Sequence, residues 1–443
     1  MKWFAGVTLL LLVALVFGLG LLAYAMYALL GVMLVSRLMS RVWAASLAAS
    51  RECNRFAVHV GETVAVVIVV ENRGVLPIAW VLMEDLLPAH ALVHEPPNLR
   101  VQGERLQLAM LKSHGRKTFF YQLECNQRGY YQIGPLVLET GDLFGLHRRY
   151  RVGTQPHFLL VYPEVVPLEG FDIASRRPIG EVHLSHRLYE DPTRIAGVRR
   201  YEAGDPLNRI HWRATARTGA LHSKVYEPST IAGATIVLDF HQVSYAPRDE
   251  PYRSELAVTA AASVANALYQ MGQQVGLVTN GRDAADRIRQ EGWDYDIRSR
   301  RAARKAAEMQ EHSDRLQPVT VETRQGPEQL LRILETLARV ELTDGLDLAQ
   351  LVTETASRLP RDATVLALLS AVTAQAAVAL GNLRRRGFAV STILNVYDQG
   401  DFEQASARLL AEGIEARHLR DREQIVTICR DYVLGSSLAL SQS

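Results

Sequence analysis

Cysteine is scarce in this 443-residue sequence, in which Cys53, Cys125 and Cys429 lie far apart. An odd number of cysteines, without a Cys-x-x-Cys pair or a Cys/His cluster, predicts neither a disulfide framework nor a zinc site and fits a reducing compartment. An excess of one charge is also absent, since 49 Lys and Arg residues stand against 47 Asp and Glu residues. Such a chain has no global attraction for nucleic acid, so we expect no nucleic-acid partner.

The common catalytic signatures are missing as well. The sequence has no GxxxxGK[ST] phosphate loop, no GxGxxG, no GxSxG elbow and no HExxH helix. A protein without the phosphate loop is not itself an ATPase of that class. We therefore predict a non-enzymatic protein that needs no cofactor.

Charged side chains are absent from residues 3–35, a run of 33 residues rich in Leu, Val, Ala and Met. One membrane span needs about 20 apolar residues, so this run is long for one helix and short for two. Because Gly18 and Gly20 interrupt it, we predict a helical hairpin of 3–18 and 21–38, with one long tilted span as the alternative. A cleaved signal peptide is disfavoured, because the apolar run continues well past the small residues that resemble a cleavage site.

The charges that flank this run predict its orientation. Lys2 precedes it, whereas Arg37, Arg41 and Arg51 follow it. Basic residues stay on the cytoplasmic side, so a hairpin and a single span both place the rest of the chain in the cytoplasm. We expect an anchor at residues 1–50, including a linking helix at 39–50, in the bilayer of a bacterial inner membrane.

From residue 51 to residue 150 the apolar pattern indicates strands. Runs rich in β-branched residues at 56–60 and 64–70 are bounded by turn residues such as Gly61 and Gly74. Shorter strands are predicted at 79–84, 105–111, 117–125 and 135–140. Short strands at this spacing, with no helix between them, are typical of an antiparallel β-sandwich.

From residue 231 to residue 443 strands alternate with helices. Continuous apolar strands are predicted at 235–239, 274–279, 365–369 and 390–396. Amphipathic helices are predicted at 253–271, 327–340, 347–358, 373–386, 401–412 and 422–434. This alternation predicts an α/β domain with a mostly parallel sheet covered on both faces. The charged residues 281–325, with a helix at 300–312, are interpreted as a solvated insertion rather than a partner-binding arm.

The densest polar segment lies in the connecting residues 151–230. Its candidate partner-binding or structural residues are Arg200, Tyr201, Gly204, Asp205, Arg209, His211, Trp212, Arg213 and Arg217. The arginines at 209, 213 and 217 recur every fourth residue, so on a helix they share one face. That face suits a phosphate or an acidic partner, and Asp205 is predicted to cap the helix.

Three interpretations of this segment remain open. It is a structural latch between domains, a surface for a partner or an anion, or a hydrolytic site in which Asp205 orients His211 as a general base. A structural latch is favoured, because no nucleophile stands out nearby and a lone Asp/His pair is common by chance.

Four motifs, in order, resemble the bacterial domain-of-unknown-function-58 family. They are Asn72-Arg73-Gly74, Arg128-Gly129-Tyr130-Tyr131-Gln132-Ile133-Gly134-Pro135, Asp142-Leu143-Phe144-Gly145-Leu146 and the segment from Arg200 to Gly219. The resemblance implies an inner-membrane protein whose last domain is von Willebrand factor A-like. It also implies an association with a MoxR-type AAA+ ATPase and, as a further partner, a membrane transglutaminase-like protein. It implies no defined reaction.

The A-like fold normally carries an Asp-x-Ser-x-Ser metal site after its first strand, because hydroxyl and carboxylate oxygens bind Mg²⁺. The matching positions here are Asp239, His241 and Val243. Valine offers no ligand atom and imidazole suits Mg²⁺ poorly, so the sequence predicts a degenerate site. Ser244 is one place out of register, while Ser370 and Asp283 are candidates for the same edge. A metal-dependent adhesion module is the alternative.

Overall fold

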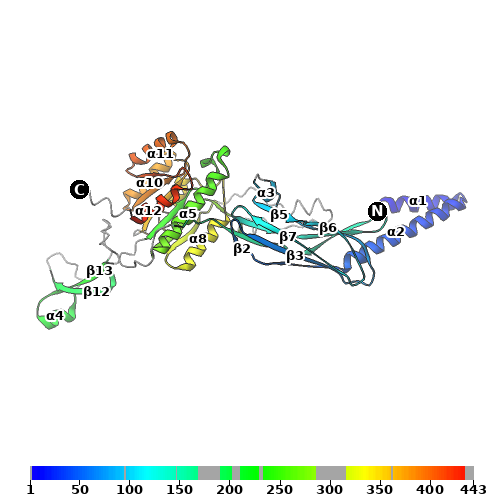
Figure 1. Cartoon of the computed structure of the whole chain (residues 1–443), viewed down its shortest axis with the longest axis horizontal. Helices are drawn as coiled ribbons and strands as arrows, with labels where there is room; N and C mark the ends of the chain where they lie inside the picture. Colours follow the sequence, from blue (N-terminus) through cyan, green and yellow to red (C-terminus); the bar gives the residue numbers. More distant parts are fainter. Residues whose placement is uncertain are drawn as a thin grey trace. The chain divides into compact units, whose positions relative to one another are not determined.

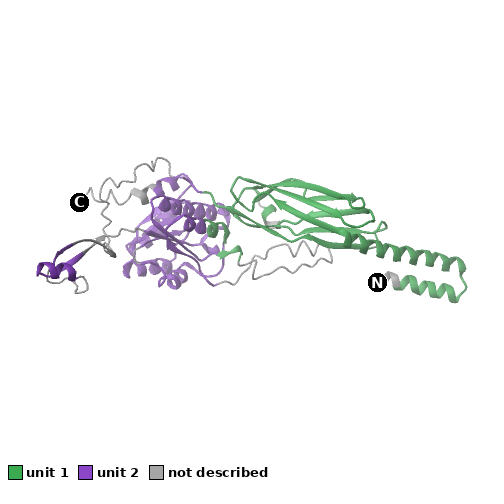
Figure 2. Cartoon of the chain, turned by 90° about the horizontal axis from the view of Figure 1, so that it is seen from below, with its two compact units in different colours: residues 1–164, 282–313, 334–341 green, residues 165–281, 314–333, 342–443 purple. Residues whose placement is uncertain are grey.

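The computed structural model describes residues 2–93, 96–145, 147–167, 190–201, 210–228, 233–285, 316–360 and 363–434. The predicted helix at 300–312 and the site residues Gly204, Asp205 and Arg209 lie outside these residues. The chain divides into two compact units (Figure 2). Unit 1 comprises residues 1–164, 282–313 and 334–341, and unit 2 comprises residues 165–281, 314–333 and 342–443.

Unit 1 begins with two apolar helices, α1 (Lys2–Val16) and α2 (Gly20–Ser46) (Figure 1). They pack together through Leu11, Ala14 and Ala23. By length and composition α2 is able to cross a membrane, whereas the apolar part of α1 is shorter. An N-terminal apolar helix, as predicted, is thus present.

The helix α2 does not end near residue 38, and the predicted linking helix at 39–50 does not exist as a separate element. The helix continues to Ser46, because its last turns bury Trp43, which is 3% exposed, in the core of the sheets that follow. Residues 47–53 then form a strand.

The strands between residues 47 and 162 form three sheets. Their bounds are β1 Leu47–Cys53, β2 Ala57–His59, β3 Thr63–Asn72, β4 Ile78–Asp85, β5 Leu99–Gly103, β6 Leu106–Leu111, β7 Arg116–Cys125, β8 Gly129–Ile133, β9 Leu136–Gly141, β10 Arg148–Thr154 and β11 His157–Tyr162, with a short helix α3 at Ala89–Val93. Two four-stranded sheets, β1-β3-β7-β5 and β10-β9-β4-β6, are antiparallel. In the third sheet, β2-β11-β8, β11 pairs with β2 in parallel. The antiparallel region thus extends beyond the predicted 51–150.

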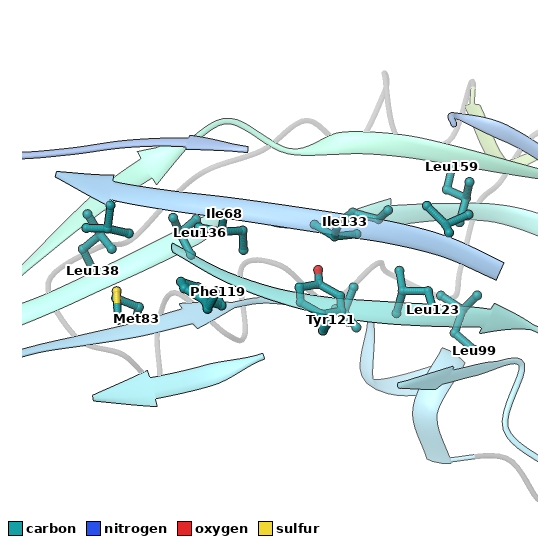
Figure 3. Packing of buried hydrophobic residues seen from close by; sticks show 14 of the residues in the cluster. Ile68, Met83, Leu99, Phe119, Tyr121, Leu123, Ile133, Leu136, Leu138 and Leu159 are labelled. Carbon is teal, nitrogen blue, oxygen red and sulfur yellow. The ribbon is translucent and has the colours of Figure 1, made fainter. Parts of the chain in front are cut away.

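Buried side chains from these sheets form one core, shown in Figure 3. Ile68 and Tyr121 come from the first sheet, and Met83 and Leu138 come from the second. Alternate residues of β3 are buried because successive side chains of a strand point to opposite faces. This pattern is the one that the sequence displayed at 64–70.

A charged cluster lies inside this apolar core. Arg51 donates to the carboxylate of Asp85 through Nε (3.1 Å) and Nη2, and both side chains are fully buried. The hydroxyl of Tyr121 donates to the same carboxylate at 2.6 Å, and Nη1 of Arg51 donates to the carbonyl of Ile133 at 2.9 Å. The buried charges are therefore paired and hydrogen-bonded, as burial of charge requires.

Unit 2 is built on a six-stranded sheet of order β17-β15-β14-β19-β20-β21. The bounds are β14 Gly233–Leu238, β15 Gln274–Thr279, β17 Val319–Arg324, β19 Ala363–Leu369, β20 Val390–Leu394 and β21 Ala416–His418. All neighbours are parallel except β17, which is antiparallel to β15. The predicted α/β region with a parallel sheet is confirmed.

Helices cover both faces of this sheet. Their bounds are α5 Tyr252–Gln270, α9 Leu348–Thr355, α10 Ala374–Arg385, α11 Gln399–Ala411 and α12 Gln424–Leu434. The helix α8 (Pro327–Arg339) begins in unit 2, and its residues from 334 onward belong to unit 1. On one face α9, α10 and α11 pack on Val237 and its neighbours. Ile236 and Leu238 point to the other face, where α5 crosses β14 and contacts α12. The short antiparallel ladder of β16 (Arg282–Asp283) with β18 (Val340–Glu341) belongs to unit 1.

One part of the predicted insertion 281–325 is a member of the central sheet, which corrects that prediction. Residues 319–324 form the edge strand β17. Its residues alternate between half-buried and exposed, because an edge strand has one face on the core and one in solvent. On the inner face of β17, the hydroxyl of Thr323 shares a hydrogen bond of 2.7 Å with the hydroxyl of Thr235 on β14.

Candidate functional site

The carboxyl edge of the six-stranded sheet is the candidate site. The chain leaves β14 to form β15 on one side and later returns to form β19 on the other, so the strand order reverses between β14 and β19. In open α/β sheets ligands bind outside the carboxyl ends of the strands at such a switch point. Asp239 follows β14 at this place, and its backbone N–H donates to the carbonyl of Leu368 on β19 at 3.0 Å.

The carboxylate of Asp239 is 1% exposed and is fully engaged by neighbouring donors. Oδ1 accepts from Nδ2 of Asn280 at 2.8 Å and from the backbone N–H of His241 at 3.3 Å. Oδ2 accepts from the hydroxyl of Ser244 at 2.6 Å. Burial raises the pKa of this carboxyl, and the hydrogen bond from Ser244 opposes that shift. The charge of the neighbouring His241 also lowers the pKa of Asp239.

The orientation of Asn280 is fixed by its other bonds. Its Oδ1 accepts from the backbone N–H of Phe240 at 2.6 Å, and its Nδ2 also donates to the carbonyl of Leu346 at 2.9 Å. The amide nitrogen must therefore face Asp239. A group of N–H donors stands where a Mg²⁺ site requires oxygen ligands. Asn280 was not singled out by the sequence analysis, although a polar residue directly after an apolar strand is a signal for such an edge.

The structure also shows where the degenerate metal positions lie. His241 caps the 3-10 turn η2 (Gln242–Ser244) by accepting from the backbone N–H of Val243 at 3.3 Å. Val243 is 80% exposed and points no ligand atom at the site. The turn brings Ser244 back to Asp239 in spite of its shifted register. Among the described residues no group of three or more His, Cys, Asp or Glu side chains is arranged to hold a metal ion.

Ser370 and Asp283, the two other residues predicted for this edge, do not lie in the same place. Ser370 follows β19 and accepts a hydrogen bond from Nδ2 of Asn395 at 3.2 Å. Asp283 lies in unit 1, where its carboxylate pairs with Arg339 at 3.4 Å and accepts from the backbone of Ala285. It is therefore not part of the hydrogen-bond network around Asp239.

A second network at the carboxyl edge includes a buried arginine that the sequence analysis missed. Arg253, 5% exposed, donates to Oδ1 of Asn395 at 3.2 Å and to the carbonyl of Arg420 at 2.9 Å. Its guanidinium lies over the rings of Tyr252 and Tyr397, at 5.6 and 5.4 Å from their centroids. The guanidinium of Arg420 also lies over the ring of Tyr397, at 5.0 Å from its centroid. Cation–π contacts thus hold these tyrosines in place.

This arrangement leaves an exposed surface, here called the edge surface, formed by Val243, Tyr252, Tyr397 and Arg420. The first three are 80%, 54% and 63% exposed, and Arg420 is exposed. All four come from loops at the carboxyl ends of parallel strands or from the start of a helix there. Exposed tyrosine and arginine are residue types enriched at protein–protein contacts.

The polar segment predicted from the sequence forms a hairpin with a short helix. β12 (Glu190–Arg200) pairs with β13 (His222–Pro228), and α4 (Trp212–Thr218) lies between them in the chain. The N-cap of α4 is His211, whose Nδ1 accepts from the backbone N–H of Ala214 at 3.0 Å. The predicted cap, Asp205, lies outside the described residues. Nδ1 of His211 therefore serves to cap the helix.

Two of the three predicted arginines lie on α4. Arg213 and Arg217 are exposed, and Trp212 beside them is 68% exposed. No residue of α4 is buried. Gly219 ends the helix with φ 71°, a left-handed conformation that glycine adopts without strain. Arg200 and Tyr201 lie at the end of β12, where the backbone N–H of Tyr201 donates to Leu221 at 2.9 Å.

Comparison with known proteins relates part of the chain to a family. The family model described as "Protein of unknown function DUF58" matches residues 197–404, from the end of β12 into α11. The "Uncharacterized protein YeaD" of Bacillus subtilis (strain 168) is 24% identical over 258 residues, which are 58% of this chain. The chain spans 62% of the length of that relative.

Two solved structures that resemble parts of the chain do so at low scores. The CARDB domain of the PF1109 protein from Pyrococcus furiosus has 12% identity and a TM-score of 0.19, over 26% of this chain and 91% of that one. The pilus adhesin SpaC from Lactobacillus rhamnosus GG has 9% identity and a TM-score of 0.32, over 56% and 34%. Scores below 0.5 support no argument about fold or function. The comparisons therefore relate residues 197–404 to the DUF58 family and assign no activity to the chain.

Proposed function

We propose that this protein is a membrane-anchored, non-enzymatic adaptor whose α/β region is von Willebrand factor A-like. The anchor is α2, alone or with α1, in a bacterial inner membrane. Arg37 and Arg41 at its carboxyl end favour a cytoplasmic location for both units, because basic flanks remain inside. Protease protection of inverted and right-side-out vesicles tests this orientation.

The observation that carries the adaptor proposal is the edge surface. Tyr252 and Tyr397 are exposed, yet Arg253 and Arg420 hold their rings in fixed positions. A pre-ordered aromatic surface loses little side-chain entropy on binding, so more of the contact energy remains as affinity. Since this surface lies at the carboxyl edge of the parallel strands, it is on the side where this kind of fold usually presents a binding site.

We also propose that partner binding at this edge does not use a divalent metal. The amide nitrogen of Asn280 donates to Asp239, and the neighbouring Ser244 hydroxyl already occupies the second carboxylate oxygen. A cation at this place would face N–H dipoles and would have to displace both donors. Isothermal calorimetry with Mg²⁺ and Mn²⁺ tests this, and tight one-to-one binding would contradict it.

The partner proposed from the family resemblance is a MoxR-type AAA+ ATPase, with a membrane transglutaminase-like protein as a further candidate. The exposed face of α4 is a second docking element, because Trp212, Arg213 and Arg217 combine an aromatic anchor with two forked cations. Tryptophan and arginine dominate binding energy at protein interfaces. The two arginines also suit an acidic partner surface.

A binding assay with matched variants tests the docking surfaces. The full-length protein in detergent or nanodiscs would be immobilised and offered the purified MoxR-type ATPase of the same genome. Tyr397→Ala and the double variant Arg213→Ala/Arg217→Ala should each weaken binding about tenfold or more, as loss of an interface anchor does. The control is Arg358→Ala/Arg386→Ala, which removes two exposed arginines elsewhere. Equal binding by all variants would contradict the proposal.

A further inference from the structure

An open pocket lies in unit 1 where the end of α2 meets β10. It has a volume of about 570 Å³ and is lined by Arg41, Ala44, Ala45, Arg148, Arg149, Tyr150 and Arg151. Four of these seven residues are arginines, and none is acidic. A pocket with this lining attracts an anion.

The four arginines are not equally free to bind a ligand. Arg151 donates to the carbonyls of Ala44 and Ala45 at the end of α2, at 3.1 and 2.8 Å, and so forms part of the wall. Arg148 pairs with Glu139 at 3.3 Å. Nε of Arg149 is buried without a hydrogen-bond partner in the part of the chain that the structure describes. Arg41 is exposed at the rim. Arg41 and Arg149 are therefore the two cations available to an anion.

The loops around the same end of the sheets present apolar side chains to solvent. The β3–β4 turn reaches the end of α2, where the backbone N–H of Arg73 donates to the carbonyl of Ser46 at 2.8 Å. This turn carries Val75, which is 77% exposed. The β9–β10 turn, which leads directly into Arg148, carries Leu143 and Phe144, 72% and 67% exposed.

A hydrogen bond network holds the β9–β10 turn in place. The carboxylate of Asp142 accepts from the backbone N–H of Phe144 at 3.0 Å and also from that of His147. The indole of Trp80 donates to the carbonyl of Asp142 at 3.3 Å. The exposed Leu143 and Phe144 are thus presented by a fixed turn, which explains the Asp-x-Phe-Gly motif in structural terms.

We infer that this pocket binds the phosphate of an anionic phospholipid headgroup, with Arg41 and Arg149 as its cations. The inference rests on the proposed membrane anchoring. Val35 is the last residue of the uncharged run, and Arg41 follows six positions later on the same helix, about 9 Å along its axis. The headgroup layer extends roughly 5–8 Å beyond the hydrocarbon on each side. The backbone of Arg41 therefore lies just beyond this layer, and its long side chain reaches back to the depth of the lipid phosphates.

The exposed apolar turns favour a lipid over a free phosphate as the source of the anion. A soluble phosphate gains no binding free energy from the apolar side chains of Val75, Leu143 and Phe144. A lipid surface buries them at the boundary between headgroups and acyl chains, while the arginines contact the phosphates. Basic and apolar groups on one end of unit 1 together match the two layers of a membrane surface.

Native mass spectrometry of the full-length protein tests the inference. The protein in neutral micelles would be titrated with phosphatidylglycerol, with phosphatidylcholine and, separately, with glycerol 3-phosphate. We expect retention of phosphatidylglycerol over phosphatidylcholine and no retention of glycerol 3-phosphate. The variant Arg41→Gln/Arg149→Gln should weaken phosphatidylglycerol binding about 30-fold, since each cation near a membrane surface contributes roughly fivefold.

The control variant is Arg55→Gln/Arg100→Gln, which removes exposed arginines that pair with Glu62 and Glu124 instead. It should bind phosphatidylglycerol as the wild type does. Equal weakening in both variants, no lipid preference, or binding of glycerol 3-phosphate alone would overturn the inference. Alkaline extraction of membranes separates the two proposals: a chain that is extracted refutes the anchor, whereas a retained chain with unchanged lipid affinity refutes only the pocket.

Discussion

Replacing Gly134 with alanine should destabilise unit 1 far more than a glycine-to-alanine change normally does. Gly134 has φ 92°, and an added Cβ would lie 2.7 Å from Cζ of Arg51 and overlap the guanidinium nitrogens. Arg51 cannot move aside, because it is fully buried and bonded to Asp85 and to the carbonyl of Ile133. The side chain must therefore either clash or break its pair with Asp85.

The magnitude follows from two contributions. A left-handed conformation costs an L-residue about 1–2 kcal/mol. Separating one partner from a buried ion pair costs about 3–5 kcal/mol, because the other charge stays buried without compensation. Partial relaxation reduces the sum, so we expect Gly134→Ala to lower the free energy of unfolding by about 3–5 kcal/mol. That is a large part of the stability of an ordinary domain.

The assay is denaturant unfolding of the full-length protein in detergent, followed by tryptophan fluorescence, to which Trp43 in the same core contributes. Gly61→Ala is a matched control, because Gly61 has φ 88° but no atom within 4 Å of an added Cβ. It should cost about 1–2 kcal/mol. If Gly134→Ala costs no more than Gly61→Ala, the described contact between Gly134 and Arg51 is wrong.

Three further predictions concern titration and reactivity. Asp239→Ala should lower the free energy of unfolding by about 2–4 kcal/mol because Asn280 loses its acceptor, whereas Asp239→Asn should cost less at pH 7. Burial raises the folded-state pKa of Asp239, so the contribution of this group to stability falls as pH rises through that pKa. This pH dependence should vanish in Asp239→Asn when melting temperatures are compared from pH 4 to 7. Burial lowers the pKa of His157, so stability should be complete above the ordinary histidine pKa and fall as pH drops through it, and His157→Gln should show a flatter profile between pH 7.5 and 5. Burial raises the pKa of Cys125 and Cys429 to about 12, so iodoacetamide at pH 8 should label neither thiol in the folded protein and both after unfolding; labelling of the folded protein would contradict their burial.

Most of the fold was predictable, because the elements with strong periodicity are also those with one buried face. Buried and more exposed side chains alternate along the whole of strand β3, and a nearly unbroken run of mostly small residues is buried in α5. Residues 47–50 were misassigned to the linking helix because their alanines favour a helix locally, while pairing with β3 decides the outcome. Residues 319–324 were misassigned because an edge strand between charged segments has a weak apolar pattern.

The candidate site was predictable only in part. Asp239 stands out as an acid at the end of an apolar strand, and its degenerate motif can be read directly. The roles of Asn280 and Ser244 depend on tertiary geometry: one arrives from the next strand and the other through a 3-10 turn that restores its position. The role of His211 as a helix cap likewise required the position of α4.

Site-specific photo-crosslinking in native membranes tests the central claim of a membrane-held adaptor most directly. A photoreactive residue would replace Val243 on the edge surface or, as a control, Val378, which is 46% exposed on α10. We predict an adduct with the MoxR-type AAA+ ATPase in the membrane fraction from position 243 and none from position 378. Absence of that adduct, or equal yields from both positions, would contradict the proposal that this edge is the partner-binding surface.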